Sequence, residues 1–417
     1  MMLKSRNLTI NNKSDSNILI YTFYIWTFVI IARPQDFIEL MVHMRPALSV
    51  GIIVFILYLF YRSFYKHRFL DNQQCRLYLY LLLTMVISIP FAYYRRGAFE
   101  FFFTKYITIV LFFFMFYKLI DNTKKINNLL WISCMGASLY SLIAIYQGQQ
   151  GSGRLAFGQM FDPNDLAFFA VSILPFNILF ISKSDPWWKR LICLFNIAIG
   201  ILFIMLTGSR GGLIALGIVV LMLLFTRSRS VNTTYKIIIA TLMFVTVIYA
   251  GSAIDYSRFE TMTQIGEDYN VWDETGRLQI WKKGFELMLS DPLTGVGVSC
   301  FGEAIGRERL ERGLPEIWQA PHNTIVQIGT ETGIIGMILF VFISYKTFRI
   351  FGKAKDVIGA EDIAKIGSMA RIGFVGHFAS AMFLSQAYSV YWAFYTVLSA
   401  SIGELLRLEM TRVRHNS

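Results

Sequence analysis

Long uncharged apolar runs recur along this 417-residue chain and set the class of structure it can form. Residues 51–61, 107–117 and 334–345 contain no charged side chain at all. A helix that spans a bilayer needs about 20 predominantly apolar residues, whereas a soluble core rarely requires such runs. Only 16% of the residues are charged, and the mean hydropathy is +0.50. A soluble chain carries about a quarter charged residues, so we expect an all-α polytopic membrane protein.

About twelve segments approach the length of a spanning helix. They lie at 17–32, 46–62, 76–93, 98–119, 127–146, 163–182, 190–206, 210–226, 236–253, 323–345, 367–385 and 389–406. The first follows a polar leader that contains Lys4, Arg6 and Lys13. Because Arg33 and Pro34 come next, and not a small-residue cleavage motif, we expect a signal anchor that stays in the membrane.

Lys and Arg gather in alternate loops, which orients the chain across the membrane. The basic set comprises 62–68, 118–125, 183–190, 227–236 and 346–355, together with both termini. The positive-inside rule makes this side cytoplasmic, and an even number of spans agrees with both termini being there. The net charge of +12 is therefore mainly topological. Because it is scattered over short loops, we do not expect nucleic acid as a partner.

The cysteines are Cys75, Cys134, Cys193 and Cys300, and three of them lie in or beside predicted spans. None are paired at the spacing of metal ligands, so neither a disulfide framework nor a metal site is expected. No cofactor is expected either.

One outward loop, residues 254–319, is much longer than the others, so we predict a single membrane domain, 1–417, with this loop inside it. Residues 276–289 place Leu278, Trp281, Phe285 and Met288 at helical spacing, which predicts an amphipathic helix. Asp291-Pro292 and the glycines after it end that helix. The loop's tryptophans at 272, 281 and 318 would stack on sugar rings or pack the loop.

Arg210 breaks the charge rule, because it lies in the outward turn Thr207-Gly208-Ser209-Arg210-Gly211-Gly212 between two apolar spans. Ionisable groups at membrane depth are costly and usually face the protein interior or water. Glycines that allow close backbone approach, an arginine and the amides of the next helix together favour an anion site. The alternative is an arginine that snorkels to the interface.

Two further positions lie near the long loop. Arg277 opens the amphipathic helix and, taken alone, is more typical of a solvated surface. His322, in Ala320-Pro321-His322-Asn323-Thr324, lies at the mouth of the next span. Histidine is suited to accept a proton near neutral pH, although a lone histidine is usually structural. Asn323 or Thr324 would cap the following helix.

The outward segment Asp162-Pro163-Asn164-Asp165 opens another span, and Arg154 lies just before it. Asn164 and Asp165 would cap that helix or bind substrate. Arg33, Arg95 and Arg96 lie on the same face, where contact with lipid phosphates is the simpler interpretation. Together, arginines, a histidine and helix N-termini at one membrane boundary favour metal-free binding of a pyrophosphate leaving group.

Three stretches resemble the O-antigen ligase and O-antigen polymerase superfamily: residues 207–216 (TGSRGGLIAL), 276–297 (GRLQIWKKGFELMLSDPLTGVG) and 321–336 (PHNTIVQIGTETGIIG). The segment from Gly153-Arg154 to Asp162-Pro163-Asn164 is also similar. This resemblance implies a GT-C-like fold, with about twelve transmembrane helices and short helices in the periplasmic loop. It implies a bacterial inner-membrane location and a periplasmic active site.

The resemblance further implies transfer of a glycan from undecaprenyl pyrophosphate, without metal or nucleotide. Arg210 and Arg277 match the family's pyrophosphate-binding arginines, and His322 matches its catalytic base. Arg154, Asn164 and Asn323 are expected to contact substrate. A ligase transfers the glycan to a sugar hydroxyl of lipid A-core, whereas a polymerase transfers it to another lipid-linked repeat. The single long loop before the last three spans favours the ligase.

Two other classes compete with this interpretation. A transporter of the same lipid-linked glycan would show inverted repeats and charged residues near mid-membrane. No repeat is evident, and the arginines gather at one rim, which favours transfer. A structural membrane protein would retain its function in the Arg210→Ala and His322→Ala variants.

Overall fold

The computed structural model describes residues 3–62, 68–151, 153–160, 162–182, 184–226, 236–237, 240–241, 276–355, 357 and 360–416. These residues form a helical bundle with one two-stranded sheet. In chain order, the elements are α1 (Leu3–Ala32), η1 (Pro34–Asp36), α2 (Glu39–Met44), α3 (Pro46–Tyr61), η3 (Phe69–Asp71), α4 (Gln73–Phe91), α5 (Arg95–Glu100), η4 (Phe101–Tyr106), α6 (Ile107–Leu119), α7 (Thr123–Gln147), β1 (Gln149–Gly151), β2 (Arg154–Ala156), η5 (Gly158–Met160), α8 (Pro163–Ile173), η6 (Leu174–Phe180), α9 (Trp187–Leu206), α10 (Arg210–Phe225), α14 (Arg277–Ser290), α15 (Phe301–Glu311), α16 (Thr324–Lys355), α17 (Glu361–Ala381) and α18 (Val390–Asn416).

Seven helical segments in the described part are long and apolar enough to cross a membrane. They are Asn17–Asp36, Gln73–Phe91, Arg95–Leu119, Thr123–Gln147, Pro163–Phe180, Trp187–Leu206 and Thr324–Lys355, and Pro46–Tyr61 and Arg210–Phe225 are shorter apolar helices. The all-α polytopic class is therefore confirmed. Of the other predicted spans, 367–385 and 389–406 fall on α17 and α18, and 236–253 lies largely outside the described residues. Twelve spans and a GT-C-like arrangement stay predictions.

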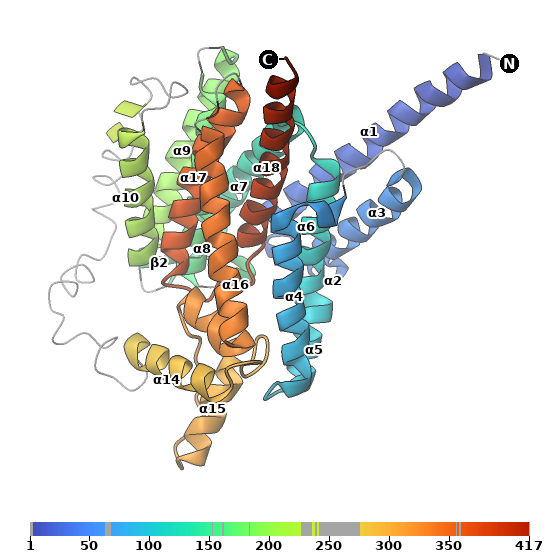
Figure 1. Cartoon of the computed structure of the whole chain (residues 1–417). Helices are drawn as coiled ribbons and strands as arrows, with labels where there is room; N and C mark the ends of the chain where they lie inside the picture. Colours follow the sequence, from blue (N-terminus) through green and yellow to red (C-terminus); the bar gives the residue numbers. More distant parts are fainter. Residues whose placement is uncertain are drawn as a thin grey trace.

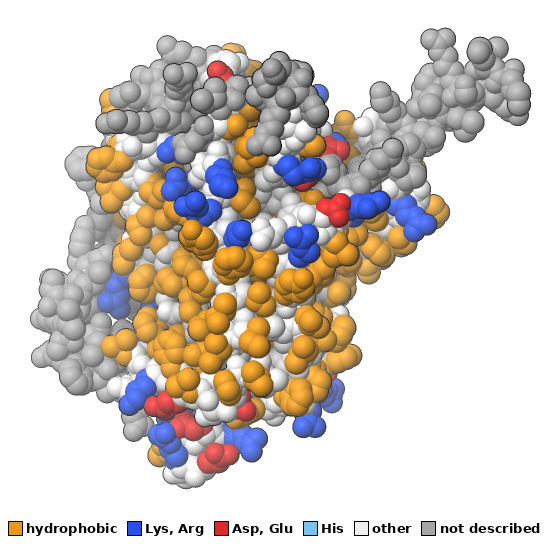
Figure 2. Space-filling view, in the orientation of Figure 1, with side chains coloured by type: hydrophobic (Ala, Val, Ile, Leu, Met, Phe, Trp, Pro, Cys, Tyr) orange, Lys and Arg blue, Asp and Glu red, His pale blue; other side chains and the backbone are white. Residues whose placement is uncertain are grey.

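The helices α14 and α15 of the long loop lie at one end of the bundle, and both chain termini lie at the other (Figure 1). Helix α16 is central, because it packs against α17, α4, α14 and α18. On the face in Figure 2, a broad apolar belt separates a band of Lys and Arg from a region of mixed charge. This distribution suits a protein whose belt contacts lipid tails, with charged side chains on either side.

Helix α16 is not the single uninterrupted span that 323–345 predicted. At Gly333, φ is 75° and ψ is −179°, so the chain forms a short helix, then a break, then the long apolar helix. Backbone groups around the break form three hydrogen bonds with the loop. Val296 N–H donates to Thr330 O (2.9 Å), Gly297 N–H to Glu331 O (3.1 Å) and Ile334 N–H to Pro292 O (2.8 Å). Irregular backbone at membrane depth requires such protein partners.

Glycine is required at residue 333 for two reasons. Its φ lies in the left-handed region, which strains other residues. A Cβ atom there would also lie 2.6 Å from the carbonyl oxygen of Pro292. The break therefore seats the end of the long loop directly on α16.

The predicted amphipathic helix is present as α14, but its buried face differs from the prediction. Ile280, Gly284 and Met288 are buried, whereas Leu278 and Phe285 are 47% and 44% exposed. Gly284 allows close packing, since a Cβ atom there would lie 2.5 Å from Val326 of α16. The sequence pattern weighted large side chains, whereas packing selected the row that contains a glycine.

Candidate active site

The N-terminus of α8 is held by Asp162, and not by Asn164 or Asp165 as predicted. The Oδ1 atom of Asp162 accepts hydrogen bonds from the backbone N–H of Asn164 (2.8 Å) and from its side-chain amide (2.7 Å). The side-chain oxygen of Asn164, Oδ1, has other partners. It accepts hydrogen bonds from Arg154 Nη2 (3.1 Å) and Ser209 Oγ (2.7 Å). Asn164 therefore joins three segments of the chain.

The turn from Thr207 to Gly212 begins α10 at Arg210. Ser209 caps this helix, because its Oγ accepts a hydrogen bond from Gly212 N–H (3.1 Å). Gly208 has a φ of 58°, and Arg154 lies across it, donating from Nε to the Thr207 carbonyl (2.9 Å). Ser209 and Gly208 thus shape this turn, and the turn also places Arg154 and Arg210 at the same cavity.

Three arginines line one cavity of about 230 Å³, which we call the arginine cavity. Arg154 comes from β2, Arg210 is the first residue of α10, and Arg277 is the first residue of α14. Asn164 and the backbone of residues 208–212 complete one wall. The N-terminus of α10 adds its partial positive charge, so the cavity is built to hold an anion.

Another part of the lining comes from the end of α17 and the connection that follows it. Ser380, Phe383 and Leu384 form this part, and sequence reasoning did not select any of them. The only hint was the polar pair Ser385-Gln386 between two apolar segments. Gln386 Nε2 donates to Asp165 Oδ1 (2.7 Å), which ties this connection to the start of α8.

His322 lies beside the arginine cavity and not among the residues that line it. Its backbone N–H donates to Ser385 Oγ (3.0 Å), next to Leu384 of the cavity wall. Its φ of 46° is left-handed, a conformation that costs free energy and gathers at functional sites. Burial lowers the pKa of the imidazole, the Arg277 charge lowers this pKa further, and Asp162 opposes both. His322 is therefore neutral at pH 7 and able to accept a proton.

Asn323 has a structural role, because its side-chain oxygen forms hydrogen bonds at the start of α16. Its Oδ1 accepts hydrogen bonds from Ile325 N–H (2.9 Å) and Val326 N–H (3.1 Å), which caps α16 as predicted. It does not line the arginine cavity. Thr324 Oγ1 instead donates to the Leu384 carbonyl (2.9 Å), so it fastens α16 to the cavity wall.

The long loop is held over the site by polar contacts as well as by packing. Trp281 Nε1 donates to the Pro321 carbonyl (2.8 Å), so the residue before His322 is tied to α14. Thr330 Oγ1 donates to the Gly284 carbonyl (2.8 Å). Trp281 thus packs the loop, whereas Trp318 is 60% exposed and Trp272 lies outside the described residues. Arg277 and His322 are thereby held on two connected segments.

Sequence reasoning also missed Glu331, which is fully enclosed beside the break in α16. Its carboxylate accepts hydrogen bonds from the backbone N–H groups of Ser299 (2.8 Å) and Phe301 (3.4 Å). These amides open α15, so the carboxylate lies at a helix N-terminus, where negative charge is favourable. A lone glutamate in an apolar run was the available signal. Its contacts position the loop and lie away from the arginine cavity.

The described residues contain no group of three or more His, Cys, Asp or Glu side chains arranged to hold a metal ion. The charged groups that do converge are arginines, whose planar guanidinium groups match phosphate oxygens in pairs. The arrangement is thus suited to bind a phosphate or pyrophosphate group beside a basic imidazole.

Comparison with known proteins agrees with this chemistry. The exopolysaccharide production protein ExoQ of Rhizobium meliloti (strain 1021) is 30% identical over 123 residues, which are 28% of this chain and 26% of that protein. The match thus spans about a quarter of that relative. Residues 195–341 match the O-antigen ligase family, a range that includes Arg210, Arg277 and His322. This match over residues 195–341 confirms the resemblance to the O-antigen ligase family that the motifs predicted.

Proposed function

We propose that the protein is a glycosyltransferase that moves a glycan from undecaprenyl pyrophosphate to a sugar hydroxyl of lipid A-core at the periplasmic face of the inner membrane. The observation that carries this proposal is the arginine cavity, where Arg154, Arg210 and Arg277 meet at a helix N-terminus beside His322. The O-antigen ligase family match supports the reaction class.

In the proposed reaction, Arg210 and Arg277 bind the pyrophosphate of the donor, and Arg154 holds the turn and the near side of the cavity. His322 accepts the proton of the acceptor hydroxyl as its oxygen attacks the anomeric carbon. The bond from that carbon to the pyrophosphate oxygen breaks, and undecaprenyl pyrophosphate leaves. The arginines offset the negative charge that develops on the leaving oxygen, so we propose that no metal ion is needed.

The family match leaves two acceptors open, and the relative's printed role in exopolysaccharide production favours a second candidate. In that reaction the acceptor is another lipid-linked repeat, so the enzyme is a polymerase. Both reactions use the same donor chemistry and the same residues. The surface glycan of a deletion strain distinguishes them: polymer on the carrier lipid with unsubstituted lipid A-core identifies a ligase, and core with a single repeat identifies a polymerase.

The direct test of transferase activity uses purified protein in lipid nanodiscs with a polyprenyl-pyrophosphate-linked oligosaccharide as donor. We expect Arg277→Ala to lower transfer about 10²- to 10³-fold while the protein still inserts into the membrane. Arg95→Ala is a matched control, because Arg95 is an exposed arginine that does not line the arginine cavity. It also takes no part in the loop contacts described above. Normal glycan transfer by Arg277→Ala would contradict the proposal.

A further inference from the structure

A second cavity, of about 680 Å³, lies beside the arginine cavity and has a different character, and we call it the wide cavity. Three cations line it: Arg33, which follows α1, Arg45, which precedes α3, and Lys105 of η4. Arg33 and Arg45 both lie in the connection between the first two predicted spans, on the predicted outward face, where the positive-inside rule disfavours basic residues. Topology therefore gives no reason for these charges.

The backbone around these cations is also unusual. Arg33 and Arg45 both have left-handed conformations, with φ values of 46° and 44°. Such conformations cost free energy in residues other than glycine and gather at binding sites. Lys105 lies in a π-helical segment inside the apolar span Arg95–Leu119. An ionisable residue at membrane depth and a π-helical turn are each typical of functional positions.

The charges of the wide cavity are available to a ligand to different degrees. Arg33 forms an ion pair with Asp36 (2.8 Å), and Asp165 also lines the cavity. Arg45 and Lys105 are exposed, and within the described part of the chain neither forms an ion pair with a carboxylate. An incoming anion would therefore contact Arg45 and Lys105 first, with Arg33 oriented by Asp36.

The remaining lining is mixed, with polar side chains such as Gln35, Thr104 and Gln159 beside apolar ones. Ile30, Ile109 and Phe168 line the wide cavity, and α2 lies at its edge through Val42. Helix α2 buries none of its residues and exposes Leu40 and Met44 by 75% and 60%. An exposed apolar helix of this kind is stable where it contacts lipid tails. The cavity thus combines a cationic floor with access for a hydrocarbon chain.

A smaller cavity of about 220 Å³ connects the wide cavity with the neighbourhood of His322. Lys105, Gln386 and Ser389 line both of these cavities. The smaller one also contacts Ser385, whose hydroxyl accepts the His322 backbone N–H. A glycan attached to a headgroup in the wide cavity would therefore reach the neighbourhood of His322 through the smaller cavity.

We propose that the wide cavity binds the phosphate headgroup of a second lipid-anchored glycan, the acceptor, through Lys105 and Arg45. This inference rests on the proposed glycan transfer. The shared chemistry is a phosphate-bearing lipid with a sugar hydroxyl. Two sources provide it: a polyprenyl pyrophosphate carrying a glycan, and the phosphorylated lipid A-core.

The test measures the KM for donor and acceptor separately with the full-length protein in nanodiscs. Lys105→Met and Arg45→Gln should each raise the acceptor KM about tenfold, the loss expected for one charge-assisted hydrogen bond. The donor KM should change less than about twofold. Lys105→Arg keeps the charge and should restore most of the loss, and Arg95→Ala is the matched control. Arg45→Gln lies at the surface, so it serves if Lys105→Met does not fold.

Three acceptors make the test discriminating: glycan-linked polyprenyl pyrophosphate, phosphorylated lipid A-core and its dephosphorylated form. Transfer only to the glycan-linked polyprenyl pyrophosphate identifies a polymerase, and transfer only to the phosphorylated lipid A-core identifies a ligase. The proposal is overturned if the dephosphorylated acceptor works equally well, or if the variants change only the donor KM. It is also overturned if phosphatidylglycerol vesicles compete as strongly as the acceptor. Wild-type protein that transfers no glycan contradicts the proposed function itself, a distinct outcome.

Discussion

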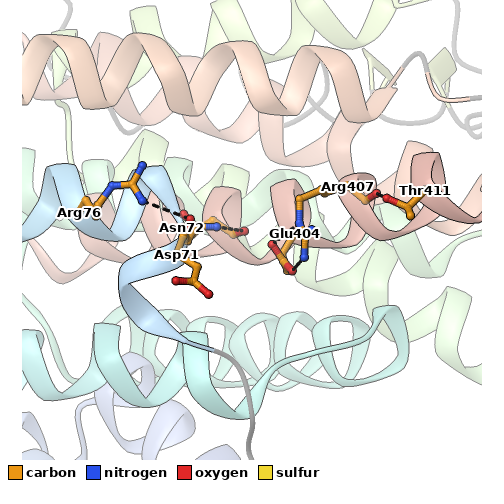
Figure 3. Close-up of polar contacts among 7 residues, drawn as sticks. Asp71, Asn72, Arg76, Glu404, Arg407 and Thr411 are labelled. Atoms are coloured by element: carbon orange, nitrogen blue, oxygen red, sulfur yellow. Dashed lines mark hydrogen bonds and ion pairs between the residues drawn. The ribbon is translucent and has the colours of Figure 1, made fainter.

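The cations at the two ends of the bundle differ in what they contact. At the end away from the long loop, Arg407 forms an ion pair with Glu404 one turn earlier in α18, and Arg76 donates to the Asp71 carbonyl (3.4 Å) (Figure 3). Asn72 joins this region by donating to the Ala400 carbonyl (3.1 Å). The Asn72 contact joins the start of α4 to α18, whereas the Arg407–Glu404 ion pair lies within α18.

At the end of the long loop, Arg154, Arg210 and Arg277 converge from three separate segments on one cavity. At the first end, a cavity of about 450 Å³ is also lined by several cations, Arg68, Lys346, Lys353 and Arg407, but Asp71 and Glu404 line it with them. Among the described residues, no carboxylate lines the arginine cavity. The comparison teaches that the number of basic residues does not identify a site. Convergence of cations from distant segments on a cavity that no carboxylate lines is the better indication, because such a cavity is suited to an anionic ligand.

The largest expected effect comes from the imidazole. His322→Ala should lower the transfer rate by about 10²- to 10⁴-fold, because it removes the proposed general base. The measurement is glycan transfer by purified protein in nanodiscs, with donor binding followed separately. Donor binding should persist, since His322 does not line the arginine cavity. A variant with the wild-type rate would assign His322 a structural role.

Removing one cavity arginine should have the next largest effect. Arg210→Ala should lower the rate about 10²- to 10³-fold, the loss typical for a group that stabilises developing negative charge. Arg210→Lys should recover only part of the rate, because an ammonium cannot offer two parallel hydrogen bonds. Equal activity of the lysine and arginine forms would show that charge alone matters at this position.

A smaller effect is expected in the pH profile. Asp162 raises the pKa of His322, so Asp162→Asn should lower that pKa and move the acid limb of activity to lower pH. The sign follows because loss of a nearby negative charge destabilises the imidazolium, so the neutral base persists to lower pH. Asparagine can still cap α8, which keeps the fold. The acid limb is measured as kcat/KM against pH, and a shift to higher pH would contradict the assignment of His322 as base.

The smallest effect is expected at the other end of the bundle. Arg407→Ala should change the transfer rate less than about twofold, because an exposed ion pair contributes little. Arg407 is 65% exposed along its side chain, and its partner Glu404 lies in the same helix. A large loss of transfer in this variant, with normal insertion, would show that cations at both ends contribute to function and would remove the contrast drawn here.

The sequence by itself determined the class of the protein and suggested most residues of the candidate site. Runs such as 334–345 require helices, because a backbone in lipid must satisfy its own hydrogen bonds. The motifs around Arg210, Arg277 and His322 predicted an anion site beside a base, and the family match confirmed the resemblance. Local features were also readable, as in the capping of α16 by Asn323. Each of these rests on neighbouring residues along the chain.

Only the tertiary structure decided which of these residues meet and which elements complete the site. The break at Gly333 and the buried face of α14 each depended on partners far away in sequence, as did the contact of Asn164 with Ser209. The wall formed by Ser380 and Leu384 lies more than 150 residues from Arg210 along the chain. Hydropathy and spacing describe how a segment meets water or lipid, whereas packing between distant segments sets where charges converge.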